Sequence, residues 1–407
     1  MTRSRLVLGL AGTVDYEVDW DARVLEDLVR RHCIRRDELT LDRAIGSERD
    51  LVATIVAFVA AGAGGERFVA SSAIVEEFAA RFTKRITLGG TPVRAALAMR
   101  ALGVTSHLHL VSIDDHVRRL LPEGCTYTCS ATEDTTDPHL IVQFPAGATI
   151  RAGDLDVTAP HPNRLIFAND PPARELVISR DLGDALVDAA VFLISGFNVI
   201  QEVDVLNRRL EDLERHLRSL ASGAVVFYED AGFHAPGLNR RVHEVLRHVV
   251  DVHSMNEDEM QAYLGRSVDL LDPDQVETAL HELSAWLAGP TLVVHTKYWA
   301  VAVGPTAGAW GPGLQGGITM ATARYVHGDH FSETDYKAAA MLPKHPAGVE
   351  MAAALGARLG DRVCCVPASR VAVPHPTTIG LGDTFVGGFI AALSSPTHRA
   401  TVTNASL

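Results

Sequence analysis

Four residues near the carboxyl end of the chain have the types and spacing that bind a phosphate group. They are Gly380, Leu381, Gly382 and Asp383, followed by an apolar run that predicts a buried helix. Glycines let successive N–H groups turn into one hollow, and a helix N-terminus binds anions through its free donors and its dipole. Asp383 then lies in the first helical turn, where it can accept a proton from an attacking hydroxyl. The alternative is a plain N-cap, because Asp is a favoured cap.

A second candidate group combines an amide with a carboxylate. Asn256 and Glu259 stand three residues apart, directly after a predicted strand and at the start of a predicted helix. Residues three apart share one face of a helix, and a hard cation takes oxygen ligands, often through water. The alternative interpretation is an Asn cap with acidic residues in the first turn.

The elements that must position these residues alternate between strand and helix. From about residue 190 onward, apolar strands at 190–195, 224–228 and 291–295 alternate with helices, which predicts a parallel sheet covered by helices. The Gly- and Pro-rich stretch Gly304–Gly317 is predicted to be a loop. The sequence therefore predicts an α/β fold whose strand ends carry the candidate residues.

A second, smaller domain is predicted from a change of pattern. Residues 104–168 have short strands, Thr-rich turns and few helices, which indicates a mostly antiparallel lid inserted into the large domain. The expected division is as follows: a large nucleotide-binding domain of residues 1–14, 46–103 and 169–407, and a sugar-binding lid of residues 15–45 and 104–168.

Composition excludes several classes of function and location. Lys and Arg number 37 against 50 Asp and Glu, so the net charge of −13 argues against general nucleic-acid binding. Five cysteines without a CxxC pair indicate reduced thiols. The longest apolar stretch, Leu51–Gly65, is too short to span a bilayer, and Met1–Leu10 lacks a full signal core. We expect a cytoplasmic protein without a nucleic-acid or membrane partner.

The order of the motifs resembles one branch of a known superfamily. The Gly380–Asp383 motif resembles the C-terminal signature of the ribokinase-like sugar kinases. Further pieces are similar, in the same order, to the ADP-dependent phosphofructokinase/glucokinase family: Asn163-Arg164, Ser195-Gly196-Phe197-Asn198, Asn256 with Glu259, and His295-Thr296. The resemblance covers nearly the whole chain. It implies a ribokinase-like three-layer αβα domain with a mainly parallel sheet, and a β-rich lid inserted discontinuously.

The resemblance also implies a reaction and its residues. The family transfers the β-phosphate of ADP to a hydroxyl of a hexose or hexose phosphate, glucose or fructose 6-phosphate, with Mg²⁺, and leaves AMP. By this resemblance Asp383 is the base and Arg164 neutralises the transferring phosphate. The other implied sites are an anion hole and nucleotide site of Gly380, Leu381, Gly382, His295 and Thr296, a sugar site of Asp15, Gly89, Gly90 and Thr91, and a metal site of Glu229, Asn256 and Glu259.

The sequence departs from the family at two positions. Thr91 replaces an Asn that can bond a sugar hydroxyl, and Phe227 replaces the His of a His-x-Glu motif that serves the metal. These departures leave open a homologue that binds sugar or nucleotide without catalysis, and an ATP-dependent ribokinase-like kinase is a further alternative. A phosphorylated acceptor would need extra cations, for which Arg94 and Arg174 are candidates. The expected assembly is a monomer or a homodimer.

Overall fold

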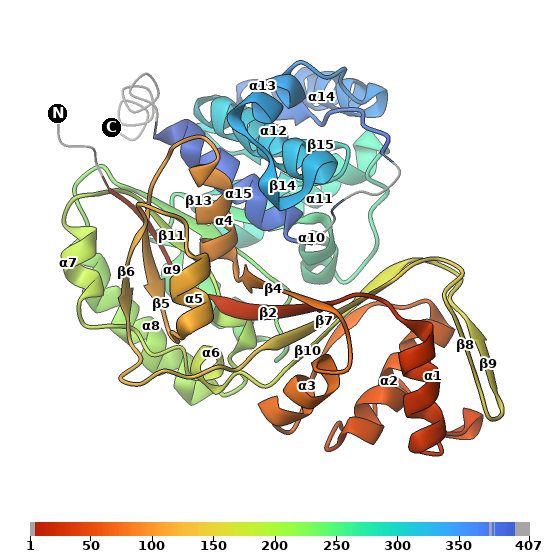
Figure 1. Ribbon diagram of the computed structural model, residues 1–407. Coiled ribbons are helices and arrows are strands. Elements are labelled where there is room, and N and C mark those ends of the chain that lie inside the picture. Colours follow the sequence, from red (N-terminus) through yellow and green to blue (C-terminus); the bar gives the residue numbers. More distant parts are fainter. Residues whose placement is uncertain (1–4, 374–376, 378, 395–407) are drawn as a thin grey trace.

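A nine-stranded sheet forms the centre of the computed structural model, which describes residues 5–373, 377 and 379–394 (Figure 1). In order across the sheet, the strands are β16 (Val363–Pro367), β15 (Trp299–Val303), β14 (Thr291–His295), β13 (Val252–Asn256), β12 (Val225–Glu229), β11 (Ala189–Ile194), β1 (Arg5–Leu8), β5 (His107–Leu110) and β6 (Thr126–Cys129). From β14 to β6 every pairing is parallel, whereas β15 and β16 run antiparallel to their neighbours. The predicted α/β class is confirmed.

Helices cover both faces of this sheet, because alternate side chains of each strand point to opposite sides. Leu193 packs into the core under one helical layer, and its neighbour Phe192 packs into the core under the other. The first layer consists of α4 (Thr91–Arg100), α12 (Gly311–His327) and α15 (Leu381–Leu393). The second consists of α7 (Leu182–Leu186), α8 (Val203–Leu217), α9 (Leu238–Leu246), α10 (Glu257–Leu264), α11 (Pro273–Leu287) and α14 (Pro346–Leu359).

Helix α12 corrects one prediction. The stretch Gly304–Gly317 was expected to be a loop, but a 17-residue helix begins at Gly311. Its glycines let α12 and α15 approach closely: a Cβ on Gly316 would lie 2.6 Å from the carbonyl oxygen of Gly388. Glycine lowers helix propensity by about 1 kcal/mol relative to alanine, so the composition alone favoured a loop. Here the glycines fix the position of the helix that carries Asp383.

A second sheet forms the lid. Its strands, in order, are β3 (Gly65–Phe68), β10 (Asn163–Ala168), β7 (His139–Phe144), β2 (Thr13–Val18) and β4 (Lys84–Gly89). Val14, Tyr16 and Val18 of β2 join the core beneath the sheet, whereas Asp15 and Glu17 lie on the other face. The lid also contains α1 (Ala22–Arg31), α2 (Glu48–Ala61), α3 (Ser72–Ala79) and the hairpin of β8 (Thr149–Ala152) and β9 (Leu155–Thr158). These elements pack against the face of the lid sheet that carries Val14, Tyr16 and Val18 (Figure 1).

Strand pairing corrects the expected domain boundaries. Strands β3 and β4 belong to the lid sheet, although residues 46–103 were expected in the large domain. Conversely, β5 and β6 belong to the large sheet, although residues 104–168 were expected in the lid. A strand's own pattern shows which faces it buries but not which sheet it joins, because pairing partners are distant in sequence. The predicted discontinuous insertion holds, with different segments.

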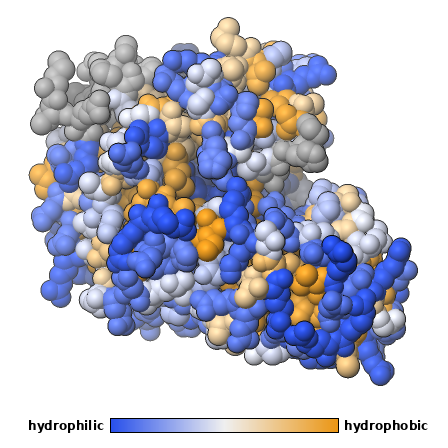
Figure 2. Space-filling model, in the orientation of Figure 1, coloured by the Kyte–Doolittle hydropathy of each residue, from blue (hydrophilic) through white to orange (hydrophobic). Residues whose placement is uncertain are grey.

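The remaining elements are short helices. They are α5 (Asp115–Leu120), α6 (Pro171–Glu175), α13 (Glu333–Ala340) and the short 3₁₀ helices η1 (Arg36–Glu38), η2 (Phe197–Val199), η3 (Ala307–Trp310), η4 (Gly328–His330) and η5 (Gly360–Arg362). Of these, only α6 lies on a connection between the two sheets. Figure 2 shows a largely hydrophilic face with an indentation between the large body and the lid. Within the described residues, no helix has the length and apolar character needed to cross a membrane.

Candidate active site

The first turn of α15 forms a hollow of backbone donors at the junction of the two domains. Gly380 caps the helix with φ +64°, a left-handed conformation that favours glycine, and its carbonyl oxygen accepts from the N–H of Thr384 at 3.0 Å. The N–H groups of the first turn have no acceptor within the helix, so they are available to an anion. The predicted position of Gly380–Asp383 at a helix N-terminus is confirmed.

Asp383 is held by two side chains from helix α4. Its Oδ1 accepts a hydrogen bond from Thr91 Oγ1 at 2.7 Å, and its Oδ2 lies 3.9 Å from Arg94 Nε. The carboxylate remains 24% exposed, so a substrate hydroxyl can reach it. The hydroxyl of Thr91, which replaces the expected amide, therefore orients Asp383.

Asp15 lies on the opposite side of the same arginine. Its Oδ2 accepts from Arg94 Nη2 at 2.7 Å, and its Oδ1 accepts from Thr13 Oγ1 at 2.8 Å. Strand β4 approaches so closely here that a Cβ on Gly89 would lie 2.4 Å from Asp15 Oδ2. The neighbouring Gly90 adopts φ +82° as it turns the chain into α4. The predicted sugar residues Asp15, Gly89, Gly90 and Thr91 therefore surround Arg94.

Arg94 is the central cation of this group. Its side chain is only 7% exposed and lies between the carboxylates of Asp15 and Asp383. Burial by itself favours the neutral form, but Asp15 and Asp383 outweigh it and raise the pKa of Arg94 above its ordinary value. Sequence reasoning considered Arg94 only for an acceptor phosphate. Its place one helical turn after the Gly89-Gly90 pair was the available signal.

The other two arginines considered from sequence lie elsewhere. Arg164 is on β10, on the same lid face as Asp15, but it pairs with Gln143, four residues along β7 from the partner of Asp15. Strand spacing and rise place Arg164 about 16 Å from Asp15. Arg174 donates to Asn169 Oδ1 at 3.2 Å. The structure therefore brings neither of them to Asp383, and the role of Arg164 stays a prediction.

Three parallel strands end beside α15 and bring polar side chains together. Glu229 ends β12, Asn256 ends β13 and His295 ends β14. His295 Nε2 lies 3.0 Å from Glu229 Oε1, and the imidazole stacks on Phe385 of α15 with ring centroids 4.5 Å apart. The carboxyl ends of parallel strands meet at one edge of the sheet, which explains how residues so distant in sequence converge.

Glu259 completes this acidic group as part of a helix cap. It accepts from the backbone N–H of Asn256 at 2.7 Å and from Asn256 Nδ2 at 2.9 Å, which makes the pair a capping box of α10. Burial, and next the charge of Glu229, raise the pKa of Glu259 well above its ordinary value. The side chains of Asn256 and Glu259 that form the helix cap are therefore the same groups that were predicted to bind a cation.

Phe227, the second departure from the family pattern, is a core residue beneath the site. Its ring packs against Phe389 with centroids 5.0 Å apart and is fully buried. The imidazole that contacts Glu229 comes instead from His295, two strands away in the sheet. Phe227 therefore packs against α15 instead of contacting Glu229. The histidine beside Glu229 is His295, from β14.

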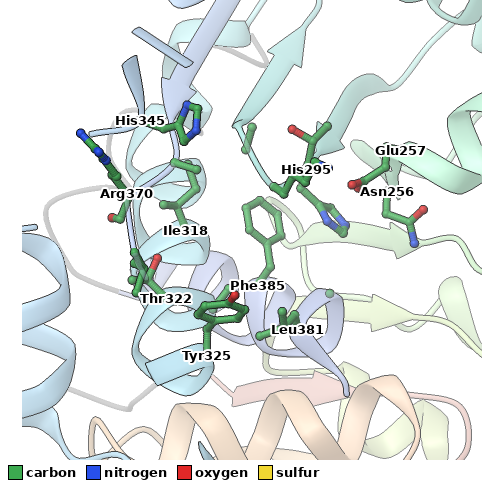
Figure 3. A pocket seen from close by; sticks show the side chains of 18 of the residues that line it. Asn256, Glu257, His295, Ile318, Thr322, Tyr325, His345, Arg370, Leu381 and Phe385 are labelled. Atoms are coloured by element: carbon green, nitrogen blue, oxygen red, sulfur yellow. The ribbon is translucent and has the colours of Figure 1, made fainter. Parts of the chain in front are cut away.

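A cavity of about 580 Å³ opens from the hollow of α15 (Figure 3). In Figure 3, Asn256 and Glu257 lie at one end of this cavity, and His345 and Arg370 lie at the other. Apolar and aromatic side chains form its walls, among them Ile318 and Tyr325 of α12, together with Phe385. Such walls can hold a flat ring, and the first-turn residues Leu381 and Gly382 line the same cavity. The sequence analysis assigned no element to the part of α12 that forms this wall, which lies beyond the predicted loop Gly304–Gly317.

Thr296 has a structural part in this cavity. Its Oγ1 donates to the carbonyl oxygen of Trp299 at 2.9 Å and accepts from the N–H groups of Tyr298 and Trp299, each at 3.1 Å. These bonds close the turn between β14 and β15. Thr296 therefore lines the cavity while it holds the turn beside His295 in shape.

Comparison with known families finds one matching family model. The conserved region of ADP-specific phosphofructokinase/glucokinase matches residues 4–308, a span that ends before Gly380–Asp383. A comparison with curated protein sequences finds no match.

Solved structures share the whole fold at low sequence identity. A phosphofructokinase from Pyrococcus horikoshii OT3 with AMP has a TM-score of 0.78 at 18% identity, covering 96% of this chain and 98% of that chain. A last common ancestor of ADP-dependent phosphofructokinases from Methanosarcinales has a TM-score of 0.75 at 16% identity, with coverage of 97% and 94%. An ADP-dependent kinase in complex with fructose-6-phosphate and ADPβS has a TM-score of 0.69 at 14% identity, with coverage of 95% and 93%.

Proposed function

Because the chain belongs to the ADP-specific phosphofructokinase/glucokinase family and is an ADP-dependent sugar kinase, we propose that Asp383 is its catalytic base. The observation that carries this role is the position of the Asp383 carboxylate, which lies in the first turn of α15 beside a hollow of free N–H groups. In the proposed step, an acceptor hydroxyl oxygen bonds to the β-phosphorus of ADP. Its proton passes to Asp383, and the bond from the β-phosphorus to the bridging oxygen breaks, which leaves AMP.

The surrounding residues bind the two substrates and offset the charge of the phosphates. The N–H groups of Leu381 and Gly382 hold the transferring phosphoryl group, and Arg94 offsets the negative charge around it. Asp15, whose two oxygens each accept a hydrogen bond, orients the acceptor hydroxyls from the lid side. Arg164 is the lid cation that closure would carry toward the transferring group. The cavity in Figure 3 receives the adenosine.

The donor set also fits Mg²⁺, which the proposed reaction requires to offset charge on the phosphates. Glu229 Oε2 is buried without a hydrogen-bond partner among the described residues, and Glu229 and Glu259 repel each other. A hard cation would relieve both conditions. Within the described residues no group of three His, Cys, Asp or Glu forms a metal site, so the ion would be held partly through water and the nucleotide. We assign Glu229, Asn256 and Glu259 to this shell.

Replacing Glu229 with Gln should weaken the binding of Mg²⁺. We expect Glu229→Gln to raise the Mg²⁺ concentration at half-maximal rate about tenfold, because one anionic ligand becomes a neutral one. Activity measured against free Mg²⁺ at saturating ADP tests this. Glu211→Gln makes the same chemical change on an exposed part of α8 and should behave as the wild type. An unchanged Mg²⁺ dependence in Glu229→Gln would contradict the assignment.

The raised pKa of Glu259 predicts how Mg²⁺ affects stability. The folded protein binds this proton more tightly than the unfolded chain does, so the stabilisation is present at low pH and is lost as pH rises from about 4.5 through the folded pKa. We expect Mg²⁺ to raise the Tm more at pH 8 than at pH 5, because it replaces the proton between the carboxylates. Equal increases at both pH values would argue against a cation at this site.

One assay separates this proposal from its alternatives. The rate is measured with ADP and with ATP against glucose, fructose 6-phosphate and related sugars, and the product nucleotide is identified. We expect AMP to form with ADP as donor, and the acceptor that reacts fastest assigns the sugar. Ligand binding without turnover at high enzyme concentration would favour a homologue that lost catalysis.

All five cysteines are free thiols, which supports the proposal of a reducing, cytoplasmic location.

A further inference from the structure

A buried carboxylate with no part in the steps described so far lies directly behind the proposed Mg²⁺ shell. Asp230 follows Glu229 at the end of β12, and its side chain is fully buried. Phe227 and Tyr228, the two residues before Glu229, pack into the cores on opposite faces of the large sheet. By the same alternation Glu229 points to the α15 face, and Asp230 points to the face that α9 and α10 cover.

The Asp230 carboxylate is held by groups from α10, β13 and the end of β12. Its Oδ2 accepts a hydrogen bond from the hydroxyl of Tyr263 in α10 and lies 3.4 Å from His253 Nε2 in β13. Its Oδ1 accepts from the N–H of Ala231 at 2.8 Å and from the hydroxyl of Tyr228 at 3.4 Å. A buried polar network in which each member is bonded holds its groups in one geometry.

These contacts join the two parts of the proposed shell. Glu229 ends β12, whereas Glu259 belongs to α10. Tyr263 lies four residues after Glu259, so the two share one face of α10, and the bond from Tyr263 to Asp230 fixes this helix against the end of β12. The N–H of Asp230 also donates to the carbonyl oxygen of Ser254 at 2.8 Å, which ties the same strand end to β13.

The ring of Tyr263 is fixed by packing as well as by its hydroxyl. It packs on Trp286 of α11 with ring centroids 4.7 Å apart, and Trp286 packs on His243 of α9 at 4.3 Å. His243 in turn meets His253, the neighbour of Asp230, with centroids 5.8 Å apart. Side chains whose rotamers are locked by packing in this way can hold a binding site in its productive geometry.

The charge of Asp230 also favours a cation in front of it. Among the described residues no Lys or Arg forms an ion pair with Asp230, and its one ion-pair contact is the imidazole of His253. Burial of a carboxylate without a permanent cation is unfavourable, and a divalent cation at Glu229 would offset part of this cost.

We propose that Asp230 and Tyr263 are positioning residues for the Mg²⁺ shell. Tyr263 holds the Asp230 carboxylate, and Asp230 fixes Glu229 relative to Glu259 and adds negative charge behind the cation. This inference rests on the proposed function, because it assumes that Glu229 and Glu259 belong to the shell. Neither Asp230 nor Tyr263 lines the nucleotide cavity, so both act through the residues that do bind ligands.

Binding of Mn²⁺ to the protein without nucleotide tests the proposal. Mn²⁺ takes the same oxygen ligands as Mg²⁺, and electron paramagnetic resonance measures its free concentration during a titration. Tyr263→Phe removes one hydroxyl and keeps the ring, and we expect it to weaken Mn²⁺ binding about tenfold. Asp230→Asn should weaken binding at least as much. Tyr263→Phe should cause no further loss in the Asp230→Asn protein, because the hydroxyl acts through that carboxylate.

Two matched controls make the same chemical changes elsewhere. Asp251 ties β13 to the other end of β12, since its Oδ2 accepts from the N–H of Val226 at 2.8 Å. Asp251→Asn should leave the Mn²⁺ affinity unchanged, and so should Tyr336→Phe on α13, which lies outside the nucleotide cavity. A merely structural role of Tyr263 would lower the Tm of Tyr263→Phe without changing its Mn²⁺ affinity, and that result would overturn the proposal.

Glu229→Gln in the same titration separates this proposal from the one it rests on. If Glu229→Gln weakens Mn²⁺ binding but neither Tyr263→Phe nor Asp230→Asn does, the shell stands and the positioning role is wrong. If Glu229→Gln binds Mn²⁺ like the wild type, or the wild type binds none, both proposals fail. Should Asp230→Asn fail to fold, Tyr263→Phe decides, because its ring keeps the packing on Trp286.

Discussion

Asp383→Asn should lower kcat by about a thousandfold while the affinity for ADP changes little. The amide has the same shape and can still accept the hydrogen bond from Thr91 Oγ1, but it cannot take the proton of the acceptor hydroxyl. The hollow of N–H groups and the adenosine cavity are unchanged, so nucleotide binding persists. Steady-state rates at saturating acceptor, with ADP affinity from titration, measure the two effects separately.

A matched control for this change is Asp361→Asn, which alters an exposed carboxylate in η5. It should retain wild-type kcat, because Asp361 does not line the cavity at the start of α15. If Asp383→Asn kept its kcat within a factor of ten of the wild type, another group would have to accept the proton. The assignment of Asp383 as the base would then be wrong.

Arg94→Met should reduce both activity and stability. Removal of the cation leaves Asp15 buried with an unpaired charge, and breaking a buried pair in this way lowers the free energy of unfolding by about 3 kcal/mol. We expect kcat to fall about a hundredfold and the KM for the sugar to rise, because Asp15 and Asp383 both lose a partner that orients them. Denaturant unfolding and steady-state kinetics measure these effects.

Two further variants separate charge from packing at this position. Arg94→Lys should recover part of the activity, whereas the double variant Arg94→Met/Asp15→Leu should recover stability without activity, since no buried charge remains unpaired. Arg358→Met removes an exposed arginine paired with Asp274 and Glu277, and it should change stability by less than about 1 kcal/mol. Equal losses in Arg94→Met and Arg358→Met would show that burial of the Arg94 pair is unimportant.

The sequence predicted the elements that carry strong local signals. The helix N-terminus at Gly380–Asp383, the α/β class and the inserted lid all follow from glycine positions and periodicity, and the structure has each of them. The assignment of Asn256 with Glu259 was also predictable as a pair, because their spacing of three places both at one helix start. These features depend on neighbours along the chain.

The missed features depend on partners that are distant in sequence. Arg94 became central only because α4 packs beside α15 and points its guanidinium between two carboxylates. The first part of helix α12, Gly311–Gly317, was mistaken for a loop because glycines that favour loops in isolation serve close packing against Gly388. His295 likewise meets Glu229 through the order of strands in the sheet, which periodicity does not determine.

The chain passes four times between the two sheets, from β1 to β2, from β4 to α4, from β6 to β7 and from β10 to β11. The lid therefore cannot be transplanted between related enzymes as one continuous cassette. An engineered chimera must exchange residues 13–89 and 139–168 together and preserve four junctions. Asp15 and Gly89 lie beside two of those junctions, so any such exchange also replaces part of the acceptor site. The chimera should therefore prefer the acceptor of the enzyme that supplied the lid.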